Sequence, residues 1–231
     1  MNILLKTRSV AAMLVIASVW GRPNDSAEAG FIASSLGPNN SYNMGDGYNL
    51  TGPKAFTGVG YGLAVRFTVG GTSPVAFGSS EMAIAYRGGT NAFDVVLATD
   101  NGGLPGTALE TIHLANLSPN PSLVLASSTA HPLLAAGSTY WLEAIAVKDT
   151  VMTWLANTQG PMDHLAYRAD TGSGPGPWGT APGDADPAFA VSPFGASPTL
   201  ASVPTPSSLS LLGIGLIGLA GRGAIRKLSA A

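Results

Sequence analysis

The sequence contains no cysteine among its 231 residues, and this absence excludes several kinds of chemistry. Disulfide bonds, Fe–S clusters, thiolate metal sites and a cysteine nucleophile all need a residue that the chain lacks. Charge is also scarce, because Asp, Glu, Lys and Arg make up only 10% of the residues. Between positions 30 and 202 there are eleven acidic and five basic residues, a net charge of −6. A segment so poor in basic residues has no electrostatic footprint for nucleic acid.

The chain also lacks a long apolar run, but it has a short one near its beginning. Lys6 and Arg8 precede the apolar stretch Val10 to Trp20, and Ala27-Glu28-Ala29 follows. A basic start, a short apolar stretch and an Ala-x-Ala site are typical of a secretory signal peptide. We predict a signal helix within residues 1–29, cleaved before Gly30. The alternative is an uncleaved N-terminal membrane helix, for which the apolar run is short.

A second short apolar run lies near the other end, in a three-part segment covering residues 203–231. Val203-Pro204-Thr205-Pro206 is followed by the run Leu209 to Ala220, and then by Arg222, Arg226 and Lys227. Twelve residues make about 18 Å of helix, less than the ~20 residues that cross a bilayer comfortably. The basic end would stay in the cytoplasm by the positive-inside rule. We predict a short hydrophobic helix that acts as a removable membrane stop; an ordinary tail anchor and a frayed amphipathic helix are the alternatives.

This tail resembles the PEP-CTERM sorting signal of Gram-negative bacteria that make exopolysaccharide. Pro204, Thr205 and Pro206 match the Pro-Glu-Pro core of that signal, with Thr205 in place of the acid. The resemblance implies processing by an exosortase-type enzyme and a transient inner-membrane intermediate. It also implies delivery to the cell surface or to the extracellular matrix of a biofilm.

The residues between the two ends, 30–202, form short apolar segments separated by turn signals. Four segments alternate between apolar and smaller or polar residues with the period of two that is typical of strands: residues 63–69, 82–86, 93–97 and 140–147. Further strands are predicted at 151–155, 165–167 and 189–191, and no long helical period occurs among them. We therefore predict an all-β domain, an antiparallel β-sandwich of jelly-roll-like form, flanked by the signal helix and the short C-terminal helix.

Two segments of this domain carry a second resemblance. Phe93-Asp-Val-Val-Leu-Ala-Thr-Asp-Asn-Gly-Gly-Leu-Pro-Gly-Thr107 is one, and Leu134-Ala-Ala-Gly-Ser-Thr-Tyr-Trp-Leu142 is the other. They are similar to segments of the choice-of-anchor extracellular domain, type R, of bacterial surface proteins. The resemblance implies a β-sandwich without assigned catalytic residues. The Asp-Asn-Gly-Gly run itself predicts a tight turn, because glycine adopts positive φ freely.

Few residues of the domain are suited to ligands. Calcium prefers oxygen ligands, and Asp184 and Asp186 supply two carboxylates in a Gly/Pro-rich loop, while Asp100 and Asn101 supply oxygens in another. A solvated acidic turn is the alternative for each loop. Trp178, in a third Gly/Pro-rich loop, is the candidate for stacking against a glycan, and simple packing is its alternative. No cofactor other than calcium is predicted.

The function predicted from these features is a non-enzymatic protein of the surface or the exopolysaccharide matrix, able to bind glycan or another protein. The alternative is a secreted carbohydrate-active hydrolase, which needs two facing carboxylates. Glu81 and Glu143 lie on predicted strands that a jelly roll could bring together. A serine hydrolase is disfavoured, because none of the histidines (His113, His131 and His164) lies beside a nucleophile motif.

Overall fold

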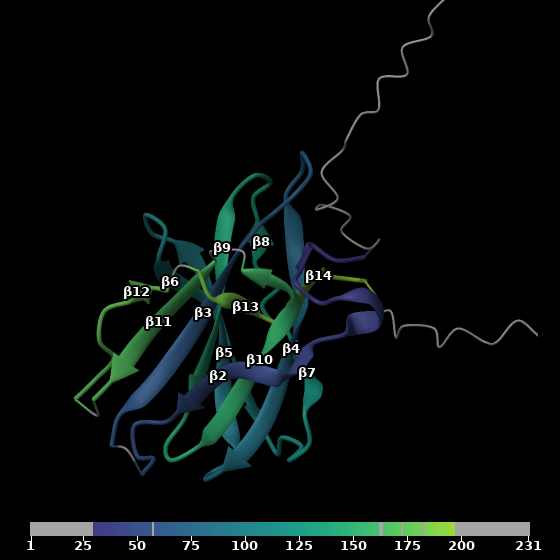
Figure 1. The fold of residues 1–231 in the computed structure, drawn as a ribbon. Helices are drawn as coiled ribbons and strands as arrows, with labels where there is room; N and C mark the ends of the chain where they lie inside the picture. The colour runs from purple at the N-terminus through teal and green to yellow at the C-terminus, as the bar shows by residue number, and fades with distance from the viewer. Residues whose placement is uncertain (1–29, 57, 162–163, 172, 182, 197–231) are drawn as a thin grey trace, which may run out of the picture.

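The computed structural model of the protein describes residues 30–196, apart from positions 57, 162–163, 172 and 182 (Figure 1). Within these residues the only helix is one 3-10 turn, Pro38–Asn40, and all other regular structure is β-strand. The prediction of an all-β domain is therefore confirmed. The predicted signal helix and the predicted C-terminal helix lie outside the described residues.

The strands of the described residues form two antiparallel sheets. One sheet has eight strands: β1 (Ala33–Ser34), β2 (Asn43–Thr51), β4 (Val75–Gly88), β7 (Ser122–Ser127), β8 (Leu133–Leu134), β10 (Val151–Pro161), β13 (Ala185–Pro187) and β14 (Phe189–Pro193). The other sheet has six: β3 (Gly60–Thr68), β5 (Ala92–Asp100), β6 (Pro105–Ala115), β9 (Thr139–Ala146), β11 (Leu165–Asp170) and β12 (Gly179–Thr180). Their orders are β1-β14-β4-β10-β13, with β2 on β10 and β7 and β8 on β4, and β12-β11-β3-β9-β5-β6.

The core lies between the two sheets and is built from one face of each. Its buried side chains come from both sheets and include residues of the alternating segments: Leu63, Val65, Phe67, Met82, Ile84, Phe93, Val95, Leu97, Leu142 and Ala144. Alternate residues of a strand point to opposite faces, so each segment buries one face and turns the other outwards. Burying an aliphatic or aromatic side chain contributes about 1.5–3 kcal/mol, and this shared core therefore supplies the main stabilisation of a domain without disulfides.

A smaller apolar cluster covers part of the outer face of the six-stranded sheet. There Trp141 packs against three fully buried alanines, Ala64, Ala98 and Ala166. Leu104 and Trp178 reach over it from two loops. The alanines have no bulk above Cβ, and this leaves room for an indole ring that is itself only 1% exposed.

The two segments of the choice-of-anchor resemblance meet in this part of the fold. The first forms β5, a turn and the start of β6, and the second leads into β9, which pairs with β5. Asp100 Oδ1 accepts a hydrogen bond from Trp141 Nε1 at 2.8 Å, and Oδ2 accepts one from the Gly103 N–H at 3.0 Å. Gly102 and Gly103 have φ values of 65° and 88°, as the turn prediction required. The sequence motif is thus explained by the architecture of one hairpin and its neighbouring strand.

The first and last strands of the described residues lie side by side. Ala33 of β1 pairs with Val191 of β14, so both ends of the described part lie at the same side of the sandwich (Figure 1). Among the residues described, no helix is long and apolar enough to span a membrane.

Candidate functional site

The two predicted calcium loops lie on different sheets and use their carboxylates differently. Asp100 is at the end of β5, and both of its oxygens accept the hydrogen bonds that hold the β5–β6 turn. Asn101 follows it in the turn, where its backbone N–H donates to the Leu104 carbonyl oxygen at 2.8 Å. The carboxylate oxygens of Asp100 that could bind calcium are therefore already used as acceptors of hydrogen bonds within the domain.

The other predicted calcium residues surround Tyr48 of β2. Asp184 is exposed, whereas Asp186 is fully buried and its Oδ2 lies 3.2 Å from Nδ1 of His164. The Tyr48 hydroxyl donates to the Ala185 carbonyl oxygen at 2.5 Å. Burial, followed by the negative charges of Asp184, Asp46 and Asp186, raises the pKa of the Tyr48 hydroxyl to about 12. Within the described part of the chain, no group of three or more His, Asp or Glu residues could hold a metal ion, and calcium stays a prediction.

Trp178 packs beside a charged pair at the outer face of the six-stranded sheet. The guanidinium of Arg168 lies 4.5 Å from the centre of the Trp178 ring, a cation–π geometry. Nη2 of Arg168 is also 3.8 Å from Oε2 of Glu143, a residue that is only 4% exposed. Burial raises the pKa of the Glu143 carboxyl to about 7, against the opposing influence of Arg168. One face of the indole is therefore occupied by a cation, and the prediction that Trp178 stacks on a glycan stays a prediction.

The carboxylate pair of the hydrolase alternative does not form. Met82 belongs to the shared core, so Glu81 beside it points out of the eight-stranded sheet. Leu142 and Ala144 belong to the same core, so Glu143 between them points out of the six-stranded sheet. Packed sheets lie about 10 Å apart, so both sheets separate the two carboxyl groups, which face in opposite directions. The hypothesis that the fold brings Glu81 and Glu143 together is therefore wrong, because the two carboxylates of a glycosidase lie ~5–10 Å apart across one cleft.

The histidines are distributed over three separate places. His113 is exposed, and its Nδ1 lies 2.7 Å from Oδ1 of Asp94 on the neighbouring strand. His164 contacts Asp186 as described above. His131, in the loop between β7 and β8, is the one that reaches a hollow of the surface.

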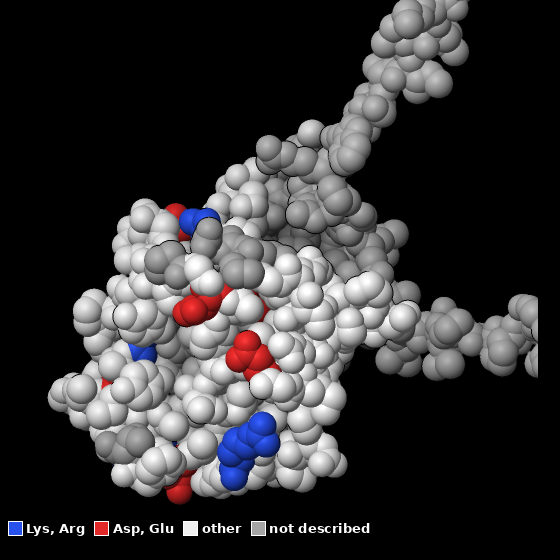
Figure 2. Space-filling model, in the orientation of Figure 1, with Lys and Arg blue, Asp and Glu red and all other residues white. Residues whose placement is uncertain are grey.

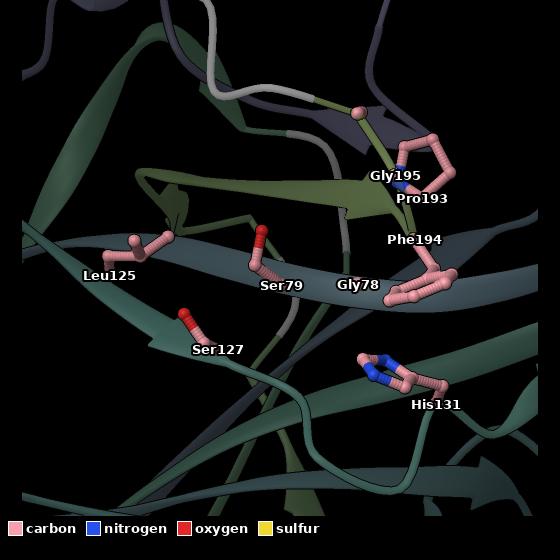
Figure 3. Close-up of a pocket in the computed structure, with 9 residues that line it drawn as sticks. Gly78, Ser79, Leu125, Ser127, His131, Pro193, Phe194 and Gly195 are labelled. Atoms are coloured by element: carbon pink, nitrogen blue, oxygen red, sulfur yellow. The ribbon is translucent and has the colours of Figure 1, made fainter.

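This hollow, of about 220 Å³, lies between β4, β7 and the end of β14. Figure 3 shows Leu125, Ser127 and Ser79 along one side of it and the rings of His131 and Phe194 at the other. The two rings are in contact, with centroids 4.0 Å apart at an angle of 45°. Gly78, Pro193, Gly195 and Ala196 complete the lining. Hydroxyl groups and aromatic rings meet here without a charged side chain in the lining.

The loop that carries His131 is organised by Glu110 of β6. One carboxylate oxygen of Glu110 accepts from the Ser128 hydroxyl at 2.6 Å. The other accepts from the N–H groups of Thr129 and Ala130 at 2.8 and 3.0 Å. Burial raises the pKa of Glu110, but these hydrogen bonds outweigh it and leave the pKa below its ordinary value. The Ser128 oxygen in turn accepts from the His131 N–H at 2.9 Å and so ties His131 to this network.

Sequence reasoning did not identify the hollow or Glu110. The lining residues come from three distant segments that become neighbours only through the β4–β7 and β4–β14 pairings. One local signal was available in the sequence, because Pro132 directly follows His131. In the structure, the backbone of His131 lies in the left-handed region, with φ 48°. That conformation is uncommon for a residue other than glycine and is concentrated at turns and functional sites.

Charged residues are sparse on the surface as well as in the composition. Figure 2 shows a few small, scattered groups of acidic and basic side chains on a face that is otherwise uncharged. The exposed aromatic and aliphatic side chains include Phe56 at 87% and Phe194 at 62% exposure. Such a surface suits uncharged partners better than polyanions.

Comparison with known proteins finds a family match for the tail of the chain and none for the sandwich. Residues 202–227 match the family model of the PEP-CTERM protein-sorting motif. This motif points to an exported protein that an exosortase-type enzyme processes at the membrane on the way to the cell surface. Val203, Pro204, Thr205 and Pro206 fall inside this match and lie outside the described residues. Ala27 and Ala29 of the predicted signal cleavage site also lie outside the described residues, and no match covers them. No curated protein and no solved structure matches the chain.

Proposed function

We propose that the protein is a non-enzymatic component of the cell surface or the exopolysaccharide matrix, sorted by an exosortase-type enzyme. The observation that carries this proposal is the sorting motif at residues 202–227, preceded by a cysteine-free β-sandwich. The sandwich supplies the part of the protein that remains after the tail is removed. Its partners are polysaccharide chains or other surface proteins of the matrix.

The proposal extends to the type of sandwich. Consecutive strands from β2 to β5, and again from β8 to β11, alternate between the two sheets, as strands of a jelly roll do. The β5–β6 turn and its hydrogen bond to Trp141 favour a relationship to choice-of-anchor domains of type R, a resemblance that implies a β-sandwich without assigned catalytic residues. The separation of Glu81 and Glu143 on opposite faces favours the non-enzymatic reading over the hydrolase.

Fractionation of the native host tests the sorting. In wild-type cells we expect a short-lived membrane form and a mature surface or matrix form that begins at Gly30 and lacks the motif at 202–227 when its ends are read by mass spectrometry. In cells without exosortase we expect the membrane form to accumulate. A mature protein that keeps both terminal segments, in either strain, contradicts the proposal.

The non-enzymatic part has a separate test. Purified protein is incubated with matrix polysaccharide of the host, and reducing ends are measured. No release of sugar is expected. Release that is abolished by Glu81→Gln or by Glu143→Gln would instead establish a hydrolase.

A further inference from the structure

We propose that the hollow between β4, β7 and the end of β14 binds a single neutral sugar ring of a polysaccharide. This inference rests on the proposed function, because it gives a matrix protein the site by which it holds the matrix. It assigns a ligand class to residues that are neither in the sorting motif nor in the loops predicted from the sequence.

The aromatic wall of the hollow is the first reason. Phe194 is 62% exposed, although water contact is unfavourable for a phenyl ring. The centre of its ring lies 4.0 Å from that of His131. Ligand sites are lined mainly by hydrophobic and aromatic side chains, with a few polar groups that fix the orientation of the ligand. The C–H face of a pyranose is apolar and flat, and it can cover such a ring.

The polar groups supply the second reason. Ser79 and Ser127 are opposite each other on β4 and β7, and both line the hollow. A hydroxyl can donate and accept, which matches the hydroxyls of a sugar. His131 adds a further group, because its Nδ1 lies 3.2 Å from the Phe77 carbonyl oxygen. A proton on Nδ1 serves that carbonyl and leaves Nε2 as an acceptor.

The site is built rather than incidental, since a network holds His131 in an uncommon backbone conformation. Its φ of 48° lies in the left-handed region, and its N–H donates to Ser128. Glu110 holds Ser128 by a hydrogen bond. It also holds Thr129 and Ala130, the two residues that lie between Ser128 and His131. Glu110 is thus a positioning residue, which acts on the hollow through the loop and not by contact with the ligand.

The charge and the size of the hollow define the ligand class. No Asp, Glu, Lys or Arg is among the described residues that line it, so it offers no ion pair to a uronate, sulfate or phosphate. Its volume of about 220 Å³ is below the ~300–1,000 Å³ typical of sites that enclose a drug-sized molecule. This volume suits one ring, and the rest of the polysaccharide runs outside over a surface on which charged side chains are sparse.

A titration of the purified full chain tests the inference. The protein is kept in a zwitterionic detergent, because glycoside detergents would compete. The probes are cellohexaose, maltohexaose and mannohexaose, with polygalacturonate as the anionic comparison. We expect saturable binding of at least one neutral probe by calorimetry and saturation-transfer NMR, and binding at least tenfold weaker for polygalacturonate.

Matched variants locate the site. Phe194→Ala is expected to weaken binding at least tenfold, and the double change Ser79→Ala with Ser127→Ala about fivefold or more. Phe56→Ala removes a phenyl ring that is even more exposed and lies outside the hollow, and it should leave the affinity within twofold. Because both phenyl rings are exposed, the melting temperatures of these two variants should stay close to that of the wild type.

Three results would overturn the inference. One is the absence of saturable binding to every neutral probe. The second is binding that Phe194→Ala and the double serine variant leave unchanged. The third is binding lost in Trp178→Ala but kept in Phe194→Ala, which would move the site to the other sheet. Correct sorting together with any of these results would leave the proposed function intact, and faulty sorting with normal sugar binding would do the reverse.

Discussion

At the scale of single residues, Glu110 is the buried carboxylate on which a loop depends. Its oxygens accept hydrogen bonds from Ser128, Thr129 and Ala130. Glu110→Gln would replace one accepting oxygen by an amide nitrogen that cannot accept, and it would remove the negative charge from the remaining hydrogen bonds. Losing hydrogen bonds to a charged acceptor costs about 1–3 kcal/mol, and of the three partners only Ser128 is buried. We expect a loss of that size in the free energy of unfolding at pH 7, measured by urea denaturation.

The acid dependence of stability provides the control for Glu110. Its pKa is lowered in the folded state, so its contribution is present above the ordinary glutamate value of about 4.3 and is lost as the pH falls through the folded value. Glu110→Gln should flatten this acid limb of the stability curve. Asp94→Asn, which disrupts an exposed pair, should change stability by less than about 1 kcal/mol. Equal effects of the two variants would show that Glu110 holds nothing in place.

Glu143 has the opposite dependence on pH. Because its pKa is raised to about 7, the folded state binds a proton that the unfolded state has released between about pH 4.3 and 7. Stability contributed by this group therefore falls as the pH rises through that window. At pH 8 the charged carboxyl costs about 4 kcal/mol at most, and Glu143→Gln should recover part of it. Urea denaturation at pH 5 and pH 8 measures the difference.

Arg168→Gln is the matched variant for this second prediction. It removes the cation 3.8 Å from Glu143 and should lower stability more at pH 8 than at pH 5. A wild-type protein whose stability rises from pH 5 to pH 8 because of Glu143 would contradict the raised pKa.

At the scale of elements, the β5–β6 turn tests backbone strain without side-chain clashes. A Cβ added to Gly102 or to Gly70 would meet no atom within 4 Å, but only Gly102 has a positive φ, of 65°. Gly102→Val should therefore destabilise the domain by about 1–3 kcal/mol, whereas Gly70→Val should be nearly neutral. Thermal melts measure both. Equal melting temperatures for the two variants would show that the turn tolerates the side chain by moving.

The calcium prediction also belongs to a loop, the one before β13. If calcium binds there, millimolar calcium should raise the melting temperature, because the metal binds only the folded state. Asp184→Ala should abolish this rise without unfolding the domain, since Asp184 is exposed. Asp186→Ala is the less informative variant, because that carboxylate is buried against His164. No calcium-dependent rise in the wild type would remove the metal from this loop.

The elements also show what local sequence patterns can and cannot reveal. Alternation predicted β3, β5 and β9, because a half-buried strand imposes a period of two. The alternating apolar residues of β3 and β5 are the ones in the shared core, whereas for β9 the pattern left open which face is buried. β2 was missed, since Asn43–Thr51 is rich in Gly and Asn and is largely exposed. The hollow was missed because Ser79, Ser127 and Phe194 are brought together by strand pairing, and long-range pairing leaves no local pattern.

At the scale of the whole molecule, the sandwich and the tail should be separable. The shared core contains residues of both sheets and, in the part of the chain that the structure describes, closes between them. Deletion of residues 209–231 should therefore release a folded protein from the membrane fraction with an unchanged melting temperature. A deletion variant that unfolds would place the tail in the core.

The position of the hollow next to the end of β14 has a mechanical consequence. Ala196 lines the hollow, and the sorting motif begins at residue 202, so the intervening chain spans at most about 20 Å. In the membrane intermediate, before the tail is removed, tension between a polysaccharide held in the hollow and the membrane-anchored tail would pass through the pairing of β14 with β4 and then leave the domain. The six-stranded sheet, to which β14 does not pair, would carry little of that load. A protein attached in this way could resist pulling without having its fold stretched.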